Sequence, residues 1–276
     1  MPSPKEHPPI PPTSKRDNPL FRSAELRDTA RFSFADQLKN SDDGALGYHS
    51  VRPGYPHEVL EMLSLTNVAG THAVDVGAGT GQLTRQLLDA GATVTAIDPS
   101  TVMLDTLATT CPDARRFLGT AESMPMLDDD SADIITCAQT WHWVNVAEAS
   151  AEFARVLSHD GVALLVWNTL DVRIPWVHRL TRIMHAGDVQ KPGFLPEVVA
   201  PLRICEVLRT EWQQQLTPEQ IVMLARTRSY WLNAKTQIRE KVEANLRWYL
   251  YDHLGFAPGV CVDLPYRCDA FLLRPS

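Results

Sequence analysis

An aspartate and three glycines, set at every second position in the stretch VDVGAGTG, have the types and spacing to hold a ligand. Asp75 stands two residues before Gly77, and Gly79 and Gly81 follow. A helix that begins after such a turn offers free backbone N–H groups and the positive end of its dipole, which favour a carboxylate. The aspartate favours a cation. A ligand with both an ammonium and a carboxylate group, hence an amino-acid moiety, satisfies both features.

A second acid, Asp98, ends the next apolar run, 23 residues after Asp75. An acid at about this distance is placed to accept hydrogen bonds from both ribose hydroxyls of a nucleoside. A dinucleotide, as in an NAD-dependent dehydrogenase, requires a third glycine where Gln82 stands, and its pyrophosphate would lie close to the charge of Asp75. An amino acid joined to a nucleoside is S-adenosylmethionine, and this is the ligand that the sequence predicts.

The elements that position these acids are short apolar runs alternating with segments of helical period. Near-continuous apolar runs of this length predict a parallel sheet covered on both faces. Ser100 is placed to cap the helix after the second run, and Gly91 to end the helix after the first. We expect strands at 72–76, 93–98, 115–120, 132–138 and 161–167, with helices at 57–65 and 147–157 among the helical segments.

The chain after Asn168 changes character. A helix is predicted within 174–187 and a longer, more polar strand at 206–216. Thr217 and Gln220 have the arrangement of a capping box, and the apolar positions Ile238, Val242, Leu246 and Leu250 mark a long amphipathic helix that ends at Gly255. The last strand is expected at 265–275. His178, Arg182 and His185 share one face of the first of these helices, which we interpret as a solvated face.

The composition indicates a globular protein, with 44% hydrophobic and 21% charged residues. A net charge of −7 argues against a nucleic-acid partner, which would require a basic surface. The five cysteines lack a C-x-x-C pair, which suits a reducing compartment and offers no metal site. With no apolar run long enough for a membrane span and no signal peptide, a cytoplasmic protein is expected, without stable membrane insertion. The oligomeric state is left open.

The N-terminal part is expected to lie outside the fold. Residues 1–31 begin with seven prolines in the first twenty positions, and we interpret them as a disordered tail. The segment 33–55 contains Gly54 between Pro53 and Pro56, so we expect an ordered loop there rather than a helix.

Four motifs stand in the order and spacing of class I S-adenosylmethionine-dependent methyltransferases: VDVGAGTGQLT, AIDPSTVML, GTAESMP and ADIITCAQTWHWVN. With YHSVRPGYP upstream, the chain resembles the small-molecule subgroup that contains trans-aconitate methyltransferase-like (methyltransferase type 11) enzymes. The resemblance covers roughly 32–275 and is strongest over 48–168. It implies an α/β, Rossmann-like, seven-stranded, mostly parallel sheet in the order 3-2-1-4-5-7-6, with the last strand antiparallel. Helices would cover both faces of this domain (32–276), and 171–204 and 217–255 would form a helical cap.

The resemblance also implies the residues around the cofactor. Those expected to bind it are Tyr48, Arg52, Asp75, Gly77, Gly79, Thr80, Gly81, Asp98, Pro99, Met103, Ala121, Glu122 and Gln139. Many relatives carry an aspartate where this chain has Thr120, so the group that recognises the adenine amine is Thr120, Glu122 or a backbone amide. Met103 is either an adenine contact or a core side chain.

The stretch TWHWVN follows the fourth strand, at the crevice where open α/β sheets bind ligands. Trp141 and Trp143 are candidates to exclude water and face the acceptor. His142 is a candidate general base or hydrogen-bond donor, and packing is the alternative for it. Arg52 is a candidate anchor for a carboxylate.

The expected reaction is in-line methyl transfer to a small-molecule acceptor. Alignment of the nucleophile and exclusion of water are the main requirements. A carboxylate acceptor is already ionised at neutral pH, whereas a phenol, amine or carbon acceptor must lose a proton. The resemblance favours an organic acid or a lipid-like metabolite. The main alternative is a non-catalytic S-adenosylmethionine-binding scaffold or sensor.

Overall fold

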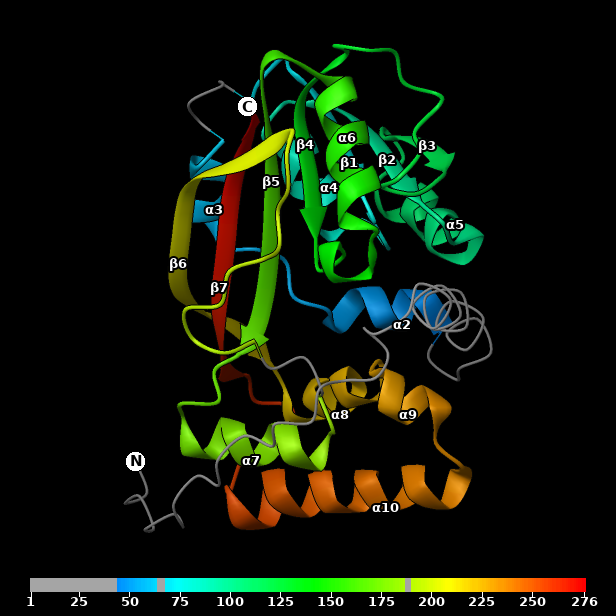
Figure 1. The fold of residues 1–276 in the computed structure, drawn as a ribbon. Coiled ribbons are helices and arrows are strands. Elements are labelled where there is room, and N and C mark those ends of the chain that lie inside the picture. Colours follow the sequence, from blue (N-terminus) through cyan, green and yellow to red (C-terminus); the bar gives the residue numbers. More distant parts are fainter. Residues whose placement is uncertain (1–43, 64–67, 187–189) are drawn as a thin grey trace.

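One seven-stranded sheet runs through the protein, in the order β3-β2-β1-β4-β5-β7-β6 (Figure 1). The structure is a computed structural model in which residues 44–63, 68–186 and 190–276 are described. The pairs β1–β2, β1–β4, β2–β3 and β4–β5 are parallel, and β7 is antiparallel to both β5 and β6. The strands are β1 His72–Val76, β2 Thr93–Asp98, β3 Arg115–Leu118, β4 Ala132–Ala138, β5 Leu157–Leu170, β6 Leu202–Leu216 and β7 Val262–Pro275. The strand order and the antiparallel last strand are as the resemblance implies.

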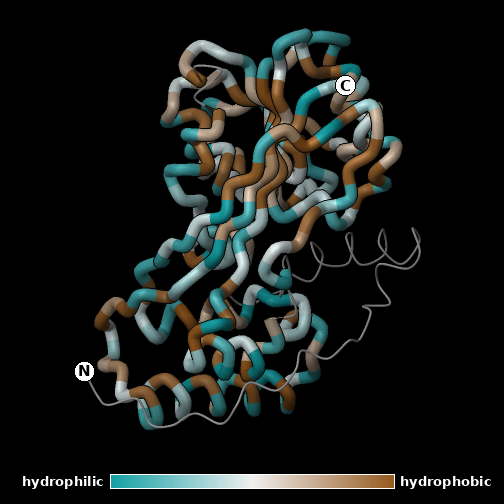
Figure 2. Tube along the Cα trace, turned by 60° about the vertical axis from the view of Figure 1, so that its left-hand side comes forward, coloured by the Kyte–Doolittle hydropathy of each residue, from teal (hydrophilic) through white to brown (hydrophobic). Residues whose placement is uncertain are grey.

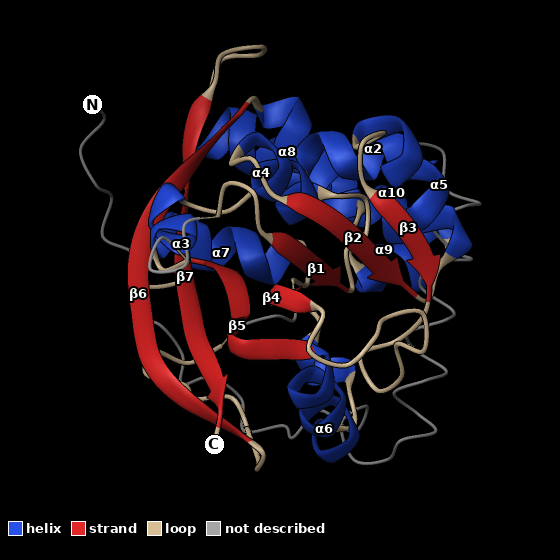
Figure 3. Ribbon diagram, turned by 90° about the horizontal axis from the view of Figure 1, so that it is seen from above, coloured by secondary structure: helices blue, strands red, loops and turns tan. Residues whose placement is uncertain are grey.

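The helices cover both faces of the sheet, as Figure 3 shows from above. On one face α6 packs through Phe153 against Val76 and Ile135, and on the other α4 and α5 pack through Leu87 and Leu107. Figure 2 shows the hydrophobic stretches gathered in the strands between them. The helices are α2 Gly44–Val51, α3 His57–Glu61, α4 Gln82–Asp89, α5 Thr101–Thr110, α6 Val146–Val156, α7 Pro175–Ile183, α8 Pro218–Arg226, α9 Ser229–Asn233 and α10 Thr236–Arg247, with a short turn η3 at Trp141–Trp143 and a wider turn η4 at Trp248–His253.

Helix starts follow the capping signals in the sequence. The Ser100 hydroxyl accepts the Met103 N–H at the start of α5. Thr217 and Gln220 form both hydrogen bonds of a capping box at the start of α8. Side-chain acceptors satisfy N–H groups that have no partner within the helix, so these residues fix where each helix begins.

The helices α7, α8, α9 and α10 gather beyond the carboxyl end of β5 and form a separate cluster there (Figure 1). Its interior includes Leu180 of α7, Leu224 of α8 and Leu246 of α10. The expected long helix that ends at Gly255 is present, because α10 continues through the π-helical η4 to His253 and Gly255 follows with a φ of +72°. One correction concerns its buried face. Ile238 is 39% exposed and does not belong to the buried stripe.

A second correction concerns 33–55, which we expected to be a loop. Residues 44–51 form α2, and the helix ends before Pro53, whose ring disfavours a helical conformation at the residue before it. The glycine and prolines that suggested a loop therefore mark only the exit from the helix. The expected tail, 1–31, lies outside the described residues. Within the described residues, no helix is long and apolar enough to cross a membrane.

Candidate functional site

The glycine loop between β1 and α4 is built from backbone conformations that favour glycine. Gly77, Gly79 and Gly81 have φ values of +70°, +56° and +94°. A Cβ atom on Gly77 would lie 2.2 Å from Thr140 Oγ1, and one on Gly81 would lie 2.8 Å from Cys111 Sγ. At Gly79 the described part of the chain has no heavy atom within 4 Å of that position. Packing therefore accounts for the outer two glycines, whereas the open space beside the middle one makes it the candidate for a ligand contact.

Asp98 lies at the end of β2, beside this loop. Its Oδ2 accepts the Gly79 N–H at 2.9 Å, and its Oδ1 accepts the Ser100 N–H at 2.9 Å. The side chain ties the middle of the loop to the start of α5 and stays 7% exposed. A contact between this carboxylate and the two ribose hydroxyls stays a prediction.

Asp75 lies deeper than its predicted role requires. Its oxygens accept hydrogen bonds from the Thr84 hydroxyl at 2.6 Å and the Thr136 hydroxyl at 2.8 Å, and the residue is 1% exposed. The carboxyl group thus joins β1 to α4 and β4. A direct contact between Asp75 and an ammonium group stays a prediction.

Burial also changes the pKa of this carboxyl group. It raises the pKa of the Asp75 carboxyl above the ordinary value of 3.8, against the effect of the two hydroxyls. Because the folded-state pKa is the higher one, folding takes up a proton between pH 3.8 and that pKa, and stability falls as pH rises through this range.

We therefore expect Asp75→Asn, which cannot ionise, to gain stability relative to the wild type between pH 4 and pH 7. Urea unfolding at the two pH values measures the difference. The exposed Asp105 on α5 provides the control, since Asp105→Asn should show no such change. An equal stability difference for Asp75→Asn at both pH values would contradict the prediction.

Helix α2 lies against the glycine loop. His49 Nδ1 is 3.1 Å from the Thr80 hydroxyl, and Gln82 Nε2 donates to the His49 carbonyl oxygen at 2.7 Å. The Arg52 guanidinium stacks 4.6 Å from the centre of the Tyr48 ring and donates to the Thr227 carbonyl oxygen, just after α8. Tyr48 and Arg52 are thus brought near the loop by α2.

Sequence reasoning did not predict roles for His49 or Gln82. The available signal was Gln82 itself, a polar residue where a dinucleotide site would have glycine. Its side chain holds α2 rather than leaving room for a pyrophosphate.

The predicted adenine side lies along β2, α5 and the segment after β3. Met103 and Ala121 are buried, Pro99 is half-buried, and Glu122 accepts the Asn145 N–H at 2.9 Å. Thr120 pairs with Ser123 through the backbone. The hydrogen bond from the Asn145 N–H thus uses a Glu122 oxygen to position the start of α6.

Gln139 follows β4 with φ of +54°, an uncommon conformation for a residue with a side chain. Its Nε2 donates to the Asn168 carbonyl oxygen at 2.5 Å. The Asn168 side chain donates to the Gly54 carbonyl oxygen at 2.7 Å and accepts from Trp212 Nε1 at 3.0 Å. Asn168 therefore connects four segments at the edge of the site, a role that no local pattern indicated.

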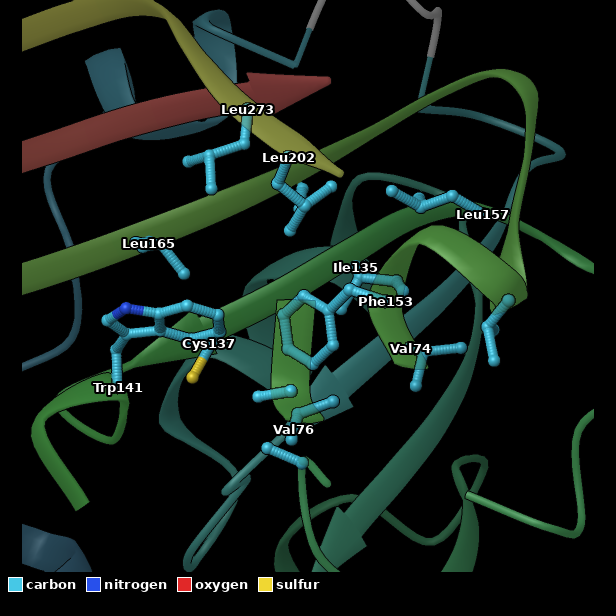
Figure 4. Packing of buried hydrophobic residues seen from close by; sticks show 14 of the residues in the cluster. Val74, Val76, Ile135, Cys137, Trp141, Phe153, Leu157, Leu165, Leu202 and Leu273 are labelled. Atoms are coloured by element: carbon cyan, nitrogen blue, oxygen red, sulfur yellow. The ribbon is translucent and has the colours of Figure 1, made fainter. Parts of the chain in front are cut away.

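The two tryptophans of TWHW have different environments. Trp141 is 2% exposed, donates from Nε1 to the Glu197 carbonyl oxygen at 2.8 Å, and packs 5.4 Å from the Phe153 ring (Figure 4). This corrects the expectation that Trp141 faces the acceptor, because its ring belongs to the core. Trp143 is half-buried, with its ring 5.0 Å from that of His142.

His142 is half-buried next to β5. Its Nδ1 lies 3.3 Å from Trp167 Nε1, which can only donate. In neutral His142 the proton is therefore on Nε2. Among the described residues, no group of three or more His, Cys, Asp or Glu side chains could hold a metal ion.

Comparison with known proteins places this geometry in a family. Residues 74–165 match the family model described as a methyltransferase domain. An uncharacterized methyltransferase of Mycobacterium tuberculosis is 40% identical over 221 residues, which cover 79% of this chain and 88% of the relative. An uncharacterized methyltransferase-like protein of Schizosaccharomyces pombe is 29% identical over 76% of this chain and 85% of its own length.

Among solved structures, a putative type II methyltransferase from Anaeromyxobacter dehalogenans shares the fold. Its TM-score is 0.56 at 21% identity, over 80% of this chain and 97% of that one. The loop with space at Gly79, the acid at the end of β2 and the strand order fit the cofactor of these enzymes. The chain belongs to the class I S-adenosylmethionine-dependent methyltransferases, and S-adenosylmethionine is its cofactor.

Proposed function

We propose that this methyltransferase acts on a small acidic metabolite and methylates a carboxylate oxygen. The observation that carries this proposal is a pair of buried polar atoms, Thr169 Oγ1 and Arg267 Nη1, that have no hydrogen-bond partner in the described part of the chain. The tautomer of His142 agrees with it, because Trp167 Nε1 donates to His142 Nδ1 and the proton of the neutral imidazole is then on Nε2. That nitrogen cannot take a proton, which suits an acceptor that arrives ionised, as a carboxylate does at neutral pH.

Two buried polar groups on β5 and β7 support an acidic acceptor, and they lie on the same face of the sheet as Trp167. Thr169 and Arg267 are register partners on β5 and β7, and Thr169 lies two residues beyond Trp167. Both residues are at least nine-tenths buried. Thr169 Oγ1 and Arg267 Nη1 have no hydrogen-bond partner in the described part of the chain. Such groups are costly to bury unless a partner is supplied.

Arg267 also has neighbours that hold it in place. Its Nη2 donates to the Gln190 carbonyl oxygen at 2.9 Å and lies 3.6 Å from Asp269 Oδ2. Asp269 in turn lies 3.3 Å from Arg209 Nε. Asp171 also lies close enough to Arg267 for their charges to interact. The cluster is therefore balanced in charge, and Arg267 Nη1 is the donor that an acceptor oxygen would satisfy.

When bound, S-adenosylmethionine supplies a methyl group on a positively charged sulfur. The residues named here would bind and orient the acceptor, with His142 donating to one carboxylate oxygen while the other attacks in line. The half-buried Trp143 would exclude water beside His142. The methyl ester that forms loses the negative charge that held it, which favours release.

The test is transfer of a tritium-labelled methyl group to a panel of small carboxylic acids and to a metabolite extract. We expect label in a base-labile ester of low molecular mass. Label in nuclease- or protease-sensitive material would overturn the acidic-metabolite proposal. S-Adenosylhomocysteine binding without transfer to any fraction would favour the scaffold alternative.

We expect Thr169→Val to raise the KM for the acid about tenfold or more without loss of stability. The substitution keeps the shape and removes a hydroxyl that has no protein partner, so folding loses no hydrogen bond. Steady-state kinetics and urea unfolding measure the two effects. An unchanged KM would place the acceptor elsewhere.

A second test is His142→Phe, which keeps a ring but removes the N–H donor, with the exposed His159→Phe as its control. A hydrogen bond to a charged acceptor is worth about 1.5–3 kcal/mol, so kcat/KM should fall roughly 10- to 150-fold.

The proposal includes a cytoplasmic location and no nucleic-acid partner. All five cysteines are free thiols in the structure, which suits a reducing compartment. The net charge of −7 disfavours nucleic acid.

A further inference from the structure

A cleft of about 430 Å³ opens in the helical cluster, between α7, α9 and α10. All of its polar side chains are exposed and within reach of a ligand. They are Arg179, Arg182, His185, Tyr230, Lys241 and Asn245.

The charge of this cleft is opposite to that of the whole chain. The net charge of the protein is −7, yet the lining has three cationic side chains and no carboxylate. Among the described residues, Arg179, Arg182 and Lys241 form no ion pair. Of the two acids of α10, Glu243 is bound to Arg226 and Arg247, and Glu240 does not line the cleft. Three cations without counter-charges in a concave site attract an anion.

One wall of the cleft is aromatic. The His185 ring stacks on Tyr230 at 3.9 Å with 20° between the planes, and the His185 backbone has a φ of +49°. Arg179 packs over the Tyr249 ring, 5.4 Å from its centre. Tyr230 and Ile238 also line a second hollow of about 310 Å³ beside the first, with Ala234. A charged end thus adjoins an apolar end.

The cleft is separate from the glycine loop. None of its lining residues belongs to the predicted cofactor set. Figure 1 shows α8 and α9 between α2, which lies against the loop, and α10. The helices between the two sites are joined to α2 by the Arg52–Thr227 hydrogen bond.

We propose that this cleft is a second ligand site, for a small molecule with a phosphate or carboxylate group on an apolar body. The anion lies between Arg182 and Lys241, and the apolar body lies on Tyr230 and Ile238. The site is independent of the proposed acceptor chemistry, since it shares no residue with it.

The experiment uses 1-naphthyl phosphate as the probe. 1-Naphthol and inorganic phosphate represent its apolar and anionic parts, and 1-naphthoate is an analogue with a carboxylate in place of the phosphate. Calorimetric titration of the full chain at low ionic strength should give binding of naphthyl phosphate or naphthoate at least tenfold tighter than of naphthol or phosphate. Comparing the affinities for naphthyl phosphate and naphthoate shows which anion the cleft prefers. Binding should persist with S-adenosylhomocysteine at saturation.

The paired substitution Arg182→Gln with Lys241→Gln should weaken naphthyl phosphate binding at least tenfold and leave S-adenosylhomocysteine affinity unchanged. Arg115→Gln with Arg116→Gln, on the exposed edge strand β3, changes the net charge equally and is the matched control. No binding of either anionic probe, equal losses in both double variants, or competition with S-adenosylhomocysteine would overturn the proposal.

Discussion

Asp98→Asn should weaken S-adenosylhomocysteine binding by about 100-fold or more in isothermal titration. The amide keeps one acceptor oxygen, which can serve Ser100 or Gly79 but not both together with two ribose hydroxyls. Each hydrogen bond lost to a charged group is worth about 1.5–3 kcal/mol, and two such losses give at least this factor. The wild type should bind S-adenosylhomocysteine and S-adenosylmethionine, and NAD should give no heat.

The control for this experiment is Asp105→Asn, an exposed acid on α5 with the same change in charge. The melting temperature of both variants shows that each is folded. If Asp98→Asn binds as tightly as the wild type, Asp98 does not hold the ribose, and the role that we assign to the end of β2 is wrong.

The second large effect is a difference between Gly77→Ala and Gly79→Ala, two substitutions in the same loop. Gly77→Ala should lose about 3 kcal/mol of unfolding free energy. Its Cβ would meet three atoms of Thr140 within 2.7 Å, and its φ of +70° disfavours any side chain. Because β1 and β4 are hydrogen-bonded neighbours, the loop has little room to move away from Thr140. Urea unfolding without cofactor measures this loss.

Gly79→Ala should instead affect cofactor binding more than stability. Its Cβ meets no described atom within 4 Å, so the loss of stability should be limited to the left-handed backbone, about 1–2 kcal/mol. The methyl group would instead occupy ligand space, and S-adenosylhomocysteine affinity should fall roughly tenfold or more. Equal stability losses in the two variants, or unchanged affinity in Gly79→Ala, would contradict the division of roles within the loop.

The sequence predicted the central strands well, because their signal is local. The bounds expected for β1, β2 and β4 match the structure, as each is a short apolar run between polar turns. For β5 the expected 161–167 was too short, since the strand spans Leu157–Leu170 and its polar ends pair with neighbours. Pairing partners far away in the chain decide where such strands end.

The residues of the candidate site also divide into those that local sequence signals predict and those that depend on distant neighbours. Glycine spacing and the position of Asp98 are visible in the sequence, because a turn and a strand end are local features. The roles of Asn168, Trp167 and Arg267 depend on neighbours brought together by the sheet, and no spacing reveals them. Trp141 resembled a site residue by its neighbours in sequence, but its ring fills a space beside α6.

The unequal lengths of the strands have a consequence for how the helical cluster can move. β7 pairs with β6 without a break in direction from Pro275 to Val262, and with β5 as far as Tyr266. The same ribbon thus belongs to the nucleotide-binding sheet at one end and reaches the helical cluster at the other. We therefore expect the cluster to move together with the sheet rather than to swing as a separate domain.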